Sequence, residues 1–374
     1  MPERRKTVLR EVLAESQILG TYDMGETIEG LARKLGKEPS EILKLNSNEN
    51  FFVPLDFLRS ALREVAKEVD PRIYPRDELG ELKEALVRYV NVSPEHIVIG
   101  TGSDQLIDLV TRMVLEPGDE ALSIAPTFSI YERCVRIQRA LYRSVPLRGD
   151  FSLDTERILG SVTPKTKLLF ICSPNNPTAN QFSRGDIELL ADQFDGLVAV
   201  DEAYVDFSNG SLVDLVNDVG NLIIFRTFSK VFGLAGLRLG CAIANPELTK
   251  VIDERYQMPY TVTITAVKVA LKLLDKIGTI EKSIREMKSE RNRLTERLNM
   301  LIGVHAFKSE TNFVLVQLER NSDEVYKALL EKGVIVRNLG TVLHLDNCLR
   351  VTVAPRPMMA KFSAALKGAL IDVA

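Results

Sequence analysis

The sequence predicts an α/β protein in which a mostly parallel sheet is covered by helices and is followed by a smaller α+β domain. From residue 95 onward, short apolar or β-branched runs alternate with helical patterns. Several of these runs end in polar or glycine-rich residues, which is typical of the ligand-binding edge of an open α/β sheet. Near the C-terminus, strand signals follow a long charged helix, and this order favours a second domain.

The first strand and helix are predicted at residues 96–103 and 103–115, with a glycine turn between them and Ser103 as the helix N-cap. Each later run of the same kind is a strand candidate whose carboxyl end should lie at one edge of the sheet. We therefore expect the chemistry to lie along that edge. The other candidates are residues 120–128, 167–174, 196–204, 221–229 and 240–246.

After about residue 270 the pattern changes to a charged helix over 281–301. Strand signals follow at 312–318, 333–339 and 349–355, with a helix between the first two. A length of 374 residues favours two domains. We predict an N-terminal arm and part of the small domain at 1–45, a large domain at 46–270 and a small domain at 271–374.

Composition and charge exclude several classes of function. The formal net charge of −3 comes from 51 acidic and 48 basic residues, with no concentrated basic stripe, so we expect no nucleic-acid partner. No apolar run approaches the roughly 18 residues that span a bilayer, and the N-terminus lacks the apolar core of a signal peptide. We therefore expect a cytoplasmic protein without a membrane partner.

Cysteines and histidines suggest neither disulfides nor a metal site. Cys134, Cys172, Cys241 and Cys348 are far apart and form no C-x-x-C pair, so we interpret them as reduced packing residues. The three histidines have no metal-ligand spacing, so we expect no metal.

The stretch FRTFSKVFGLAGLRLG, residues 225–240, sets one lysine among hydroxyls and glycines. Lys230 would act as a nucleophile only if burial or a nearby cation lowered its pKa from about 10.4; otherwise it is a surface lysine after a strand. Thr227, Ser229 and Arg238 could bind an anion together with the turn GTGSD at 100–104, while Gly233 and Gly236 permit close backbone approach.

Two more polar motifs follow strand candidates. DEAYVDF places Asp201 and Tyr204 at a strand end, where Asp201 could pair with a protonated ring nitrogen or could merely cap a helix dipole. SPNNPTAN at 173–180 is a rigid turn that could aim the amide of Asn176.

The order of these motifs resembles that of the pyridoxal-phosphate enzymes of fold type I. The motifs are KLNSNEN, RIYP, GTGSDQ, PTFSIY, SPNNPT, DEAYVDF, RTFSK and LRVTV. Within that group the chain is most similar to the histidinol-phosphate aminotransferases, over nearly its whole length. The resemblance implies a large domain with a mostly parallel seven-stranded sheet, pyridoxal 5'-phosphate as cofactor, and a homodimer with composite sites.

The resemblance also implies roles for individual residues. Lys230 resembles the lysine that holds the cofactor as a Schiff base and carries a proton at the substrate α-carbon. Asp201 resembles the partner of the pyridinium nitrogen, and Tyr204 and Asn176 the pair that binds the phenolic oxygen. Phe128 resembles the aromatic residue stacked on the cofactor ring. The implied contacts of the cofactor phosphate are Ser103, Asp104, Thr227, Ser229, Arg238 and the other subunit's Tyr74. The implied contacts of the substrate are Tyr22, Asn48, Arg337 and Arg350.

The implied reaction is transamination of L-histidinol phosphate with 2-oxoglutarate, giving imidazole acetol phosphate and glutamate in histidine biosynthesis. Arg350 would bind the substrate carboxylate and Arg337 the distal phosphate, although Arg337 could instead pair with Asp346. The chain departs from the family pattern at Phe51, Phe52 and Ala179, and it lacks a proline before Gly25. Alternatives are an aromatic amino acid aminotransferase, a threonine-phosphate decarboxylase and a non-enzymatic regulator.

Overall fold

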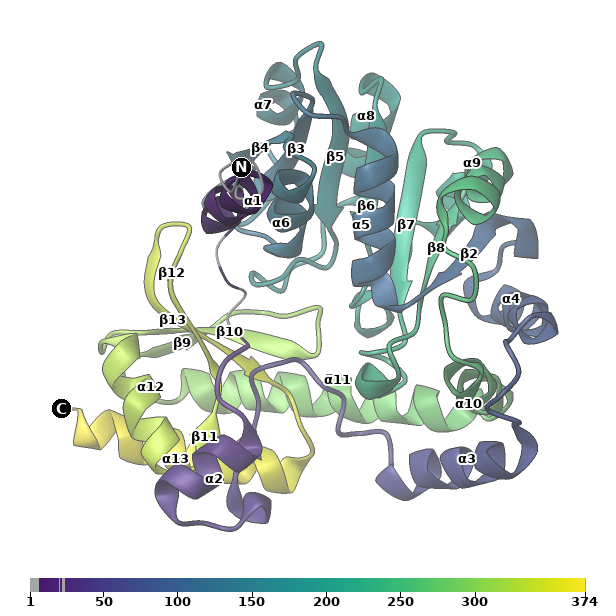
Figure 1. Cartoon of the computed structure of the whole chain (residues 1–374). Helices are drawn as coiled ribbons and strands as arrows, with labels where there is room; N and C mark the ends of the chain where they lie inside the picture. The colour runs from purple at the N-terminus through teal and green to yellow at the C-terminus, as the bar shows by residue number, and fades with distance from the viewer. Residues whose placement is uncertain (1–6, 20, 22–23, 374) are drawn as a thin grey trace.

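The structure, a computed structural model, describes residues 7–19, 21 and 24–373. Its largest element is a seven-stranded sheet in the order β2-β8-β7-β6-β5-β3-β4 (Figure 1). β8 is antiparallel to both neighbours, and every other neighbouring pair is parallel. The prediction of a mostly parallel sheet in an α/β fold is confirmed. Its strands are β2 (Ile97–Gly100), β3 (Glu120–Ala125), β4 (Leu141–Pro146), β5 (Thr166–Cys172), β6 (Leu197–Asp201), β7 (Leu222–Thr227) and β8 (Gly240–Ala244).

Continuous apolar runs form the central strands because both faces of this sheet are covered. In β5, Leu169 and Ile171 belong to one core cluster while Leu168 and Phe170 belong to the other. The period of two along a strand therefore divides each run between two cores. One face packs against α5 (Gly102–Val114), α6 (Ile130–Ile137) and α9 (Pro246–Val251); the other packs against α4 (Asp77–Val90), α7 (Thr155–Gly160), α8 (Arg184–Gln193) and α10 (Ile264–Asp275).

A second, antiparallel sheet has the order β12-β13-β10-β9 and lies beside the first (Figure 1). A two-stranded parallel sheet joins residues 43–44 to residues 334–335, so a segment near the N-terminus lies against the C-terminal part of the chain. The strands are β1 (Leu43–Lys44), β9 (Val304–Ala306), β10 (Phe313–Leu318), β11 (Val334–Ile335), β12 (Arg337–Val342) and β13 (Leu345–Thr352). The remaining helices are α1 (Thr7–Ile18), α2 (Ile28–Leu35), α3 (Leu55–Glu68), α11 (Ile277–Asn299), α12 (Ser322–Glu331) and α13 (Arg356–Asp372).

Three local features differ from the sequence-based expectation. Helix α5 begins at Gly102 with Thr101 as its N-cap, so the prediction that Ser103 caps this helix is wrong. The positive φ of Gly102, 75°, starts the helix early and leaves Ser103 inside the first turn. The strand expected at 333–339 is divided between β11 and β12, and β4 was not predicted.

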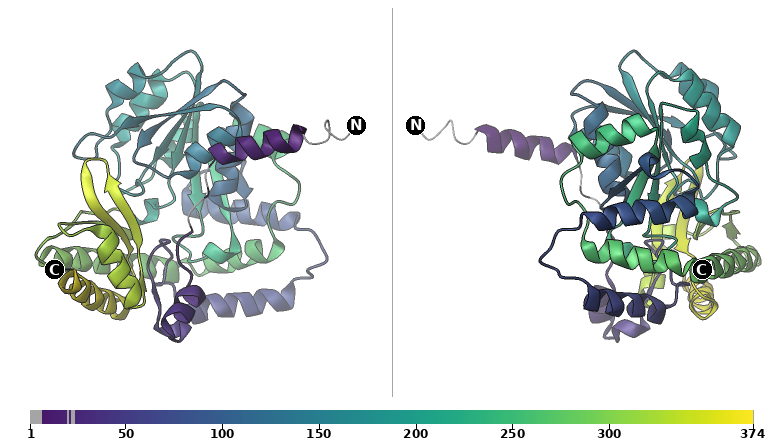
Figure 2. Two further views of the ribbon diagram at one scale, coloured as in Figure 1. Left: turned by 60° about the vertical axis from the view of Figure 1, so that its left-hand side comes forward. Right: turned by 90° about the vertical axis from the view of Figure 1, so that its right-hand side faces the viewer.

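The four cysteines are free and buried, in agreement with the interpretation as packing residues. Among the described residues, no helix combines the length and the apolar character needed to cross a membrane. Helix α1 projects from the body of the molecule in both views of Figure 2.

Gly240 lies where β8 meets the first turn of α5. A β-carbon there would come within 2.6 Å of the Ser103 nitrogen and 2.7 Å of the Gly102 carbonyl carbon, and neither backbone atom can move alone. We predict that Gly240→Ala lowers the free energy of unfolding by about 1–3 kcal/mol in urea denaturation. Gly236→Ala is the control because nothing lies within 4 Å of its added carbon. Equal losses in the two variants would contradict the prediction.

Candidate active site

The predicted residues gather at the carboxyl edge of the large sheet, where the chain leaves β2, β5, β6 and β7. The segment 45–50 crosses this edge and contacts residues from both sheets. The Asn50 amide donates to the Val231 carbonyl oxygen at 2.9 Å. On the other side, the Thr352 N–H donates to the Leu45 carbonyl oxygen at 2.9 Å. The site is therefore bounded by the two sheets and this segment.

Lys230 lies in the turn after β7 and is partly buried. Its Nζ donates to the Ser47 carbonyl oxygen at 2.9 Å and lies 5.9 Å from the ring centroid of Tyr204. Burial, together with the nearby Arg350 cation, lowers the pKa of Lys230 to about 8, although Glu49 opposes this effect. The amine is therefore neutral in a useful fraction of molecules near neutral pH, as a nucleophile or base must be.

Asp201 ends β6 and is only 3% exposed. Its carboxylate accepts from the Tyr131 hydroxyl at 2.8 Å and from the Ala203 N–H at 3.0 Å. Burial raises the pKa of Asp201 to about 6, so the group is still a carboxylate at neutral pH. Among the described residues no ion pair includes Asp201, so its charge is available to a cationic ligand atom.

Tyr131 was not predicted from the sequence. It lies in the first turn of α6, and Phe128 precedes that helix by two residues. The Tyr131 ring stacks on Phe170 with centroids 4.8 Å apart, and Phe128 lies edge-on to it at 5.7 Å. Phe128 therefore adjoins the ring whose hydroxyl donates to Asp201.

Tyr204 is fixed by Asn48, whose amide nitrogen donates to the phenolic oxygen at 3.0 Å. Burial raises the pKa of Tyr204 above its ordinary value, so the phenol keeps its proton. Asn48 was predicted as a substrate contact; the structure adds this contact to Tyr204. Asn48 has a left-handed φ of 56°, which asparagine tolerates better than most residues.

Arg350 on β13 connects the two sheets. Its guanidinium donates to the Asn176 side-chain oxygen at 2.6 Å and to the Asn46 carbonyl oxygen at 2.7 Å. It also lies 5.3 Å from the ring centroid of Phe313. Asn176 therefore contacts Arg350 here, and Asn46 is a contact that the sequence did not indicate.

Arg337 is directly opposite Arg350 in the β12–β13 register, so both side chains are on one face of the small sheet. The alternative pairing of Arg337 with Asp346 is wrong. Asp346 accepts from the Thr341 hydroxyl at 2.8 Å, near the other end of the hairpin. Tyr22, the other residue predicted at the distal phosphate, lies outside the described residues.

An anion-binding arrangement forms where α5 begins. Arg238, with a left-handed φ of 51°, directs its guanidinium to the Asp104 carboxylate at 2.9 Å and to the Ser229 hydroxyl at 3.4 Å. Thr227 accepts from the Ser229 N–H at 3.1 Å. The N–H groups of the first turn of α5, which includes Ser103, complete a set of donors suited to a phosphate.

The glycines near the site differ in how closely other atoms approach them. Gly102 has a φ of 75°, and a β-carbon there would lie 2.7 Å from the Arg238 guanidinium, so a larger residue would be strained. Gly233 has a φ of 69° and packs closely on Asn50, as expected. The expectation of close approach at Gly236 is wrong because nothing lies within 4 Å of a β-carbon added there.

The comparisons with known proteins identify the family. The family profile of aminotransferase class I and II matches residues 40–366. The chain belongs to the class I and II aminotransferases. It is 38% identical to the histidinol-phosphate aminotransferase of Methanosarcina mazei over 94% of this aminotransferase and 93% of that protein. It is 36% identical to the enzyme of the same name from Thermoanaerobacter pseudethanolicus, over 83% and 88% of the two chains.

A solved structure agrees with this assignment. The histidinol-phosphate aminotransferase of Sinorhizobium meliloti, in complex with pyridoxal-5'-phosphate, superposes with a TM-score of 0.84 at 25% identity. The match covers 94% of this aminotransferase and 96% of that chain. The resemblance derived from the motifs is thereby confirmed, and so is fold type I.

The lowered pKa of Lys230 leads to a prediction for the cofactor-free protein. Acetylation of Lys230, followed by mass spectrometry across a pH series, should show a midpoint near pH 8 rather than the ordinary 10.5, because only the neutral amine reacts. Arg350→Gln removes a nearby cation and should raise the midpoint, whereas Glu49→Gln removes an anion and should lower it. Shifts of the same sign in both variants would contradict this electrostatic account.

Proposed function

We propose that this aminotransferase transfers the amino group of L-histidinol phosphate to 2-oxoglutarate, giving imidazole acetol phosphate and glutamate in histidine biosynthesis. The observation that carries the chemistry is a partly buried amine, Lys230, whose pKa of about 8 lies near neutrality, in the same site as the buried carboxylate of Asp201. The substrate is supported by the relatives named above, which cover most of the chain. Arg337 and Arg350, side by side in register, suit anionic substrates.

The residues at the sheet edge fit pyridoxal 5'-phosphate as the cofactor. The anion-binding arrangement is shaped by Gly102, since a β-carbon there would meet Arg238, and it offers a helix N-terminus and a guanidinium to a phosphate. Asp201 offers a buried carboxylate without an ion pair to a ring nitrogen. When bound, the cofactor supplies an electron sink that stabilises negative charge at the substrate α-carbon.

The chain's own residues perform the remaining work. Lys230 would hold the cofactor and would move a proton at the substrate α-carbon. Asp201, held by Tyr131, would keep a proton on the ring nitrogen, and Tyr204 with Asn176 would bind the phenolic oxygen. Residues that hold the phosphate are Ser103, Asp104, Thr227, Ser229 and Arg238, with Phe128 against the ring.

Two arginines divide the recognition of substrates. Arg350 binds the α-carboxylate of glutamate with its planar fork, in place of the bonds it makes to Asn176 and Asn46. Arg337, together with Tyr22, contacts the distal end of the substrate, where histidinol phosphate carries its phosphate, and Asn48 is a further substrate contact. Because one site accepts both substrates in turn, the kinetics are expected to be ping-pong.

The proposed reaction is tested by following glutamate formation from 2-oxoglutarate with purified protein and pyridoxal phosphate. Histidinol phosphate should be used far faster than phenylalanine, and Lys230→Ala should lower the rate by at least about 10³-fold because proton transfer and covalent binding are both lost. Faster reaction of phenylalanine would replace the proposal with an aromatic amino acid aminotransferase. Carbon dioxide release from threonine phosphate without an oxo acid would indicate a decarboxylase. The absence of turnover with every substrate would indicate a non-enzymatic regulator.

The homodimer with composite sites is part of the same proposal. Tyr74 is 69% exposed and stacks on Tyr260 with centroids 4.3 Å apart. Ile73 and Met258 beside it are also exposed, and exposed apolar groups of this kind mark protein interfaces. A second apolar set lies on the projecting helix α1, at Val8, Leu9, Val12 and Leu13. We further propose the cytoplasm as the location and 1–45, 46–270 and 271–374 as the divisions of the chain.

Subunit complementation tests the composite site. Lys230→Ala and Tyr74→Ala chains are each prepared alone and then refolded together. In a mixed dimer, the Lys230 of one chain meets the intact Tyr74 of the other, so a random mixture should recover about a quarter of wild-type activity by subunit statistics. Activity that never exceeds the average of the two separate variants would show that each chain forms its whole site alone.

A further inference from the structure

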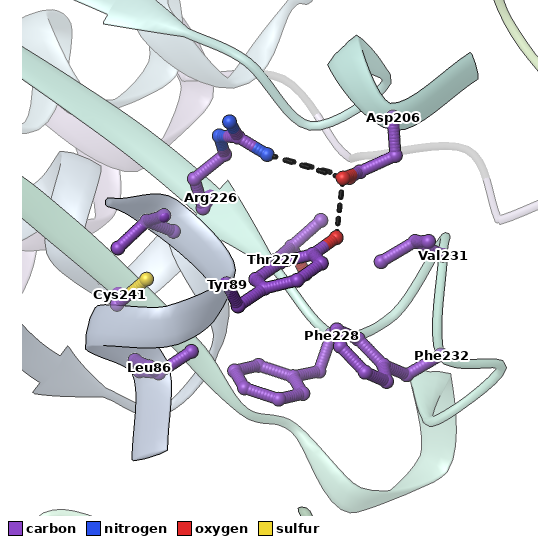
Figure 3. Close-up of a pocket in the computed structure, with 10 residues that line it drawn as sticks. Leu86, Tyr89, Asp206, Arg226, Thr227, Phe228, Val231, Phe232 and Cys241 are labelled. Carbon is purple, nitrogen blue, oxygen red and sulfur yellow. Dashed lines mark hydrogen bonds and ion pairs between the residues drawn. The ribbon is translucent and has the colours of Figure 1, made fainter. Parts of the chain in front are cut away.

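A buried cluster of charges lies behind the proposed site, and none of the proposed roles uses it. Arg226 on β7 donates through Nε to the Glu202 carboxylate at 2.9 Å and through Nη1 to both Asp206 oxygens at 3.3 and 3.4 Å. The Tyr89 hydroxyl on α4 donates to the same Asp206 carboxylate. Figure 3 shows Tyr89 and Arg226 meeting at Asp206, beside Cys241 and Thr227. We call Tyr89, Glu202, Asp206 and Arg226 the rear cluster.

The rear cluster is fully bonded. Glu202, 1% exposed, also accepts from the Ser211 hydroxyl and from the Leu212 N–H, both at 2.7 Å. Desolvation raises the pKa of Glu202 and alone would lower that of Arg226, but the two carboxylates outweigh burial and raise the pKa of Arg226. The arginine is therefore charged. Buried ion groups contribute little net stability compared with apolar packing, so their value is in fixing geometry.

The position of the rear cluster follows from strand alternation. Asp201 and Glu202 are consecutive, so their side chains leave opposite faces of the sheet, and Arg226 and Thr227 are related in the same way. The backbone of Asp201 is paired with Phe225, and Arg226 is paired with Cys241 of the core on the Glu202 side. Glu202 thus adjoins Asp201 in sequence and Arg226 adjoins Thr227, while Asp206 follows Tyr204 by two residues.

The cluster also joins strands whose ends carry the chemistry. Asp201 is the last residue of β6, and Lys230 follows the end of β7 by three residues. Beyond Asp201, one ladder bond continues the pairing, from the Glu202 N–H to the Phe225 carbonyl oxygen at 2.9 Å. The forked bonds of Arg226 to Glu202 and Asp206 extend this connection past the end of the ladder, where strands otherwise separate.

We propose that the rear cluster consists of positioning residues, which act from the opposite face of the sheet to hold the Asp201 carboxylate and the Lys230 amine in their working geometry. The inference rests on the proposed function only in taking pyridoxal phosphate as the group that both residues contact. It does not depend on which amino donor is used. Errors of about 1 Å in such a geometry cost roughly 10²-fold in rate, which makes the effect measurable.

The test uses a double variant, Glu202→Gln with Arg226→Met, which removes opposite charges together and leaves the Tyr89 bond to Asp206. Its control is Glu120→Gln with Arg143→Met, an ion pair of 3.2 Å between the start of β3 and the edge strand β4 of the same sheet. For each protein we would measure the unfolding midpoint, the Kd of the cofactor-free protein for pyridoxal phosphate, and kcat and KM for the glutamate half of the reaction.

If the rear cluster positions the site, its double variant binds pyridoxal phosphate about tenfold more weakly and loses about tenfold or more in kcat, with the KM for glutamate little changed. The control keeps wild-type values for all three. Wild-type Kd and kcat in the rear-cluster variant, whatever its unfolding midpoint, would overturn the proposal and leave the cluster a purely stabilising role. Because these measurements use glutamate and the cofactor alone, a wrong choice of amino donor would not affect them.

Arg226→Lys keeps the test decisive if the double variant does not fold. It retains the charge that the buried carboxylates need but cannot form the planar fork to both of them. The expected result is a folded protein with a smaller rise in Kd and a smaller loss of kcat in the same directions. A folded Arg226→Lys protein with unchanged Kd and kcat would equally overturn the proposal.

Discussion

The partial desolvation of the Lys230 amine is the constraint on which the rest of the site depends. Burial is the largest cause of its lowered pKa, and the carbonyl oxygen of Ser47 is its hydrogen-bond partner. Partial removal from water in turn makes each neighbouring charge effective over a longer distance than in bulk water. Arg350 and Glu49 therefore influence the amine in opposite directions without touching it.

The candidate active site is assembled by the segment 45–50 together with the two sheets, and not by either sheet alone. Its backbone is bonded to the small sheet through Leu45 and Thr352, and the Asn48 carbonyl oxygen accepts from Asn312 at 2.9 Å. Its side chains reach the large sheet at Tyr204 and Val231. A short stretch near the N-terminus therefore sets the relative placement of Arg350 and Lys230, which come from different sheets.

The sequence allowed most of the fold and much of the candidate site to be predicted, because both depend on local order. Strands ending in polar motifs identified the sheet edge, and the resemblance then implied roles for Lys230, Asp201 and Arg238. Strand β4 was missed because it lies at the edge of the sheet with a mixed and largely exposed pattern, so it lacks the apolar run of a buried strand. Tyr131 and Asn46 were missed because only the folded chain brings them to Asp201 and Arg350.

The rear cluster escaped sequence analysis for a different reason. Glu202 and Arg226 are 24 residues apart, and each adjoins a residue with a more evident chemical role. An alternating strand presents such neighbours to opposite faces, so one motif can serve two environments at once. Within DEAYVDF, some side chains face the candidate site and others face the core. A motif match alone does not show which residues belong to which group.

Two residues near the site adopt strained backbone conformations. Ala179 and Arg238 have left-handed φ values of 65° and 51°, a conformation that costs a residue with a β-carbon about 1–2 kcal/mol. The surroundings of Ala179 offset this cost: it is fully buried, and its carbonyl oxygen accepts from the Glu310 N–H at 2.7 Å. At Arg238 the same conformation turns the guanidinium back toward α5. Packing of the surrounding structure offsets this strain. As a result, the Arg238 guanidinium is held beside a helix N-terminus before any anion is bound.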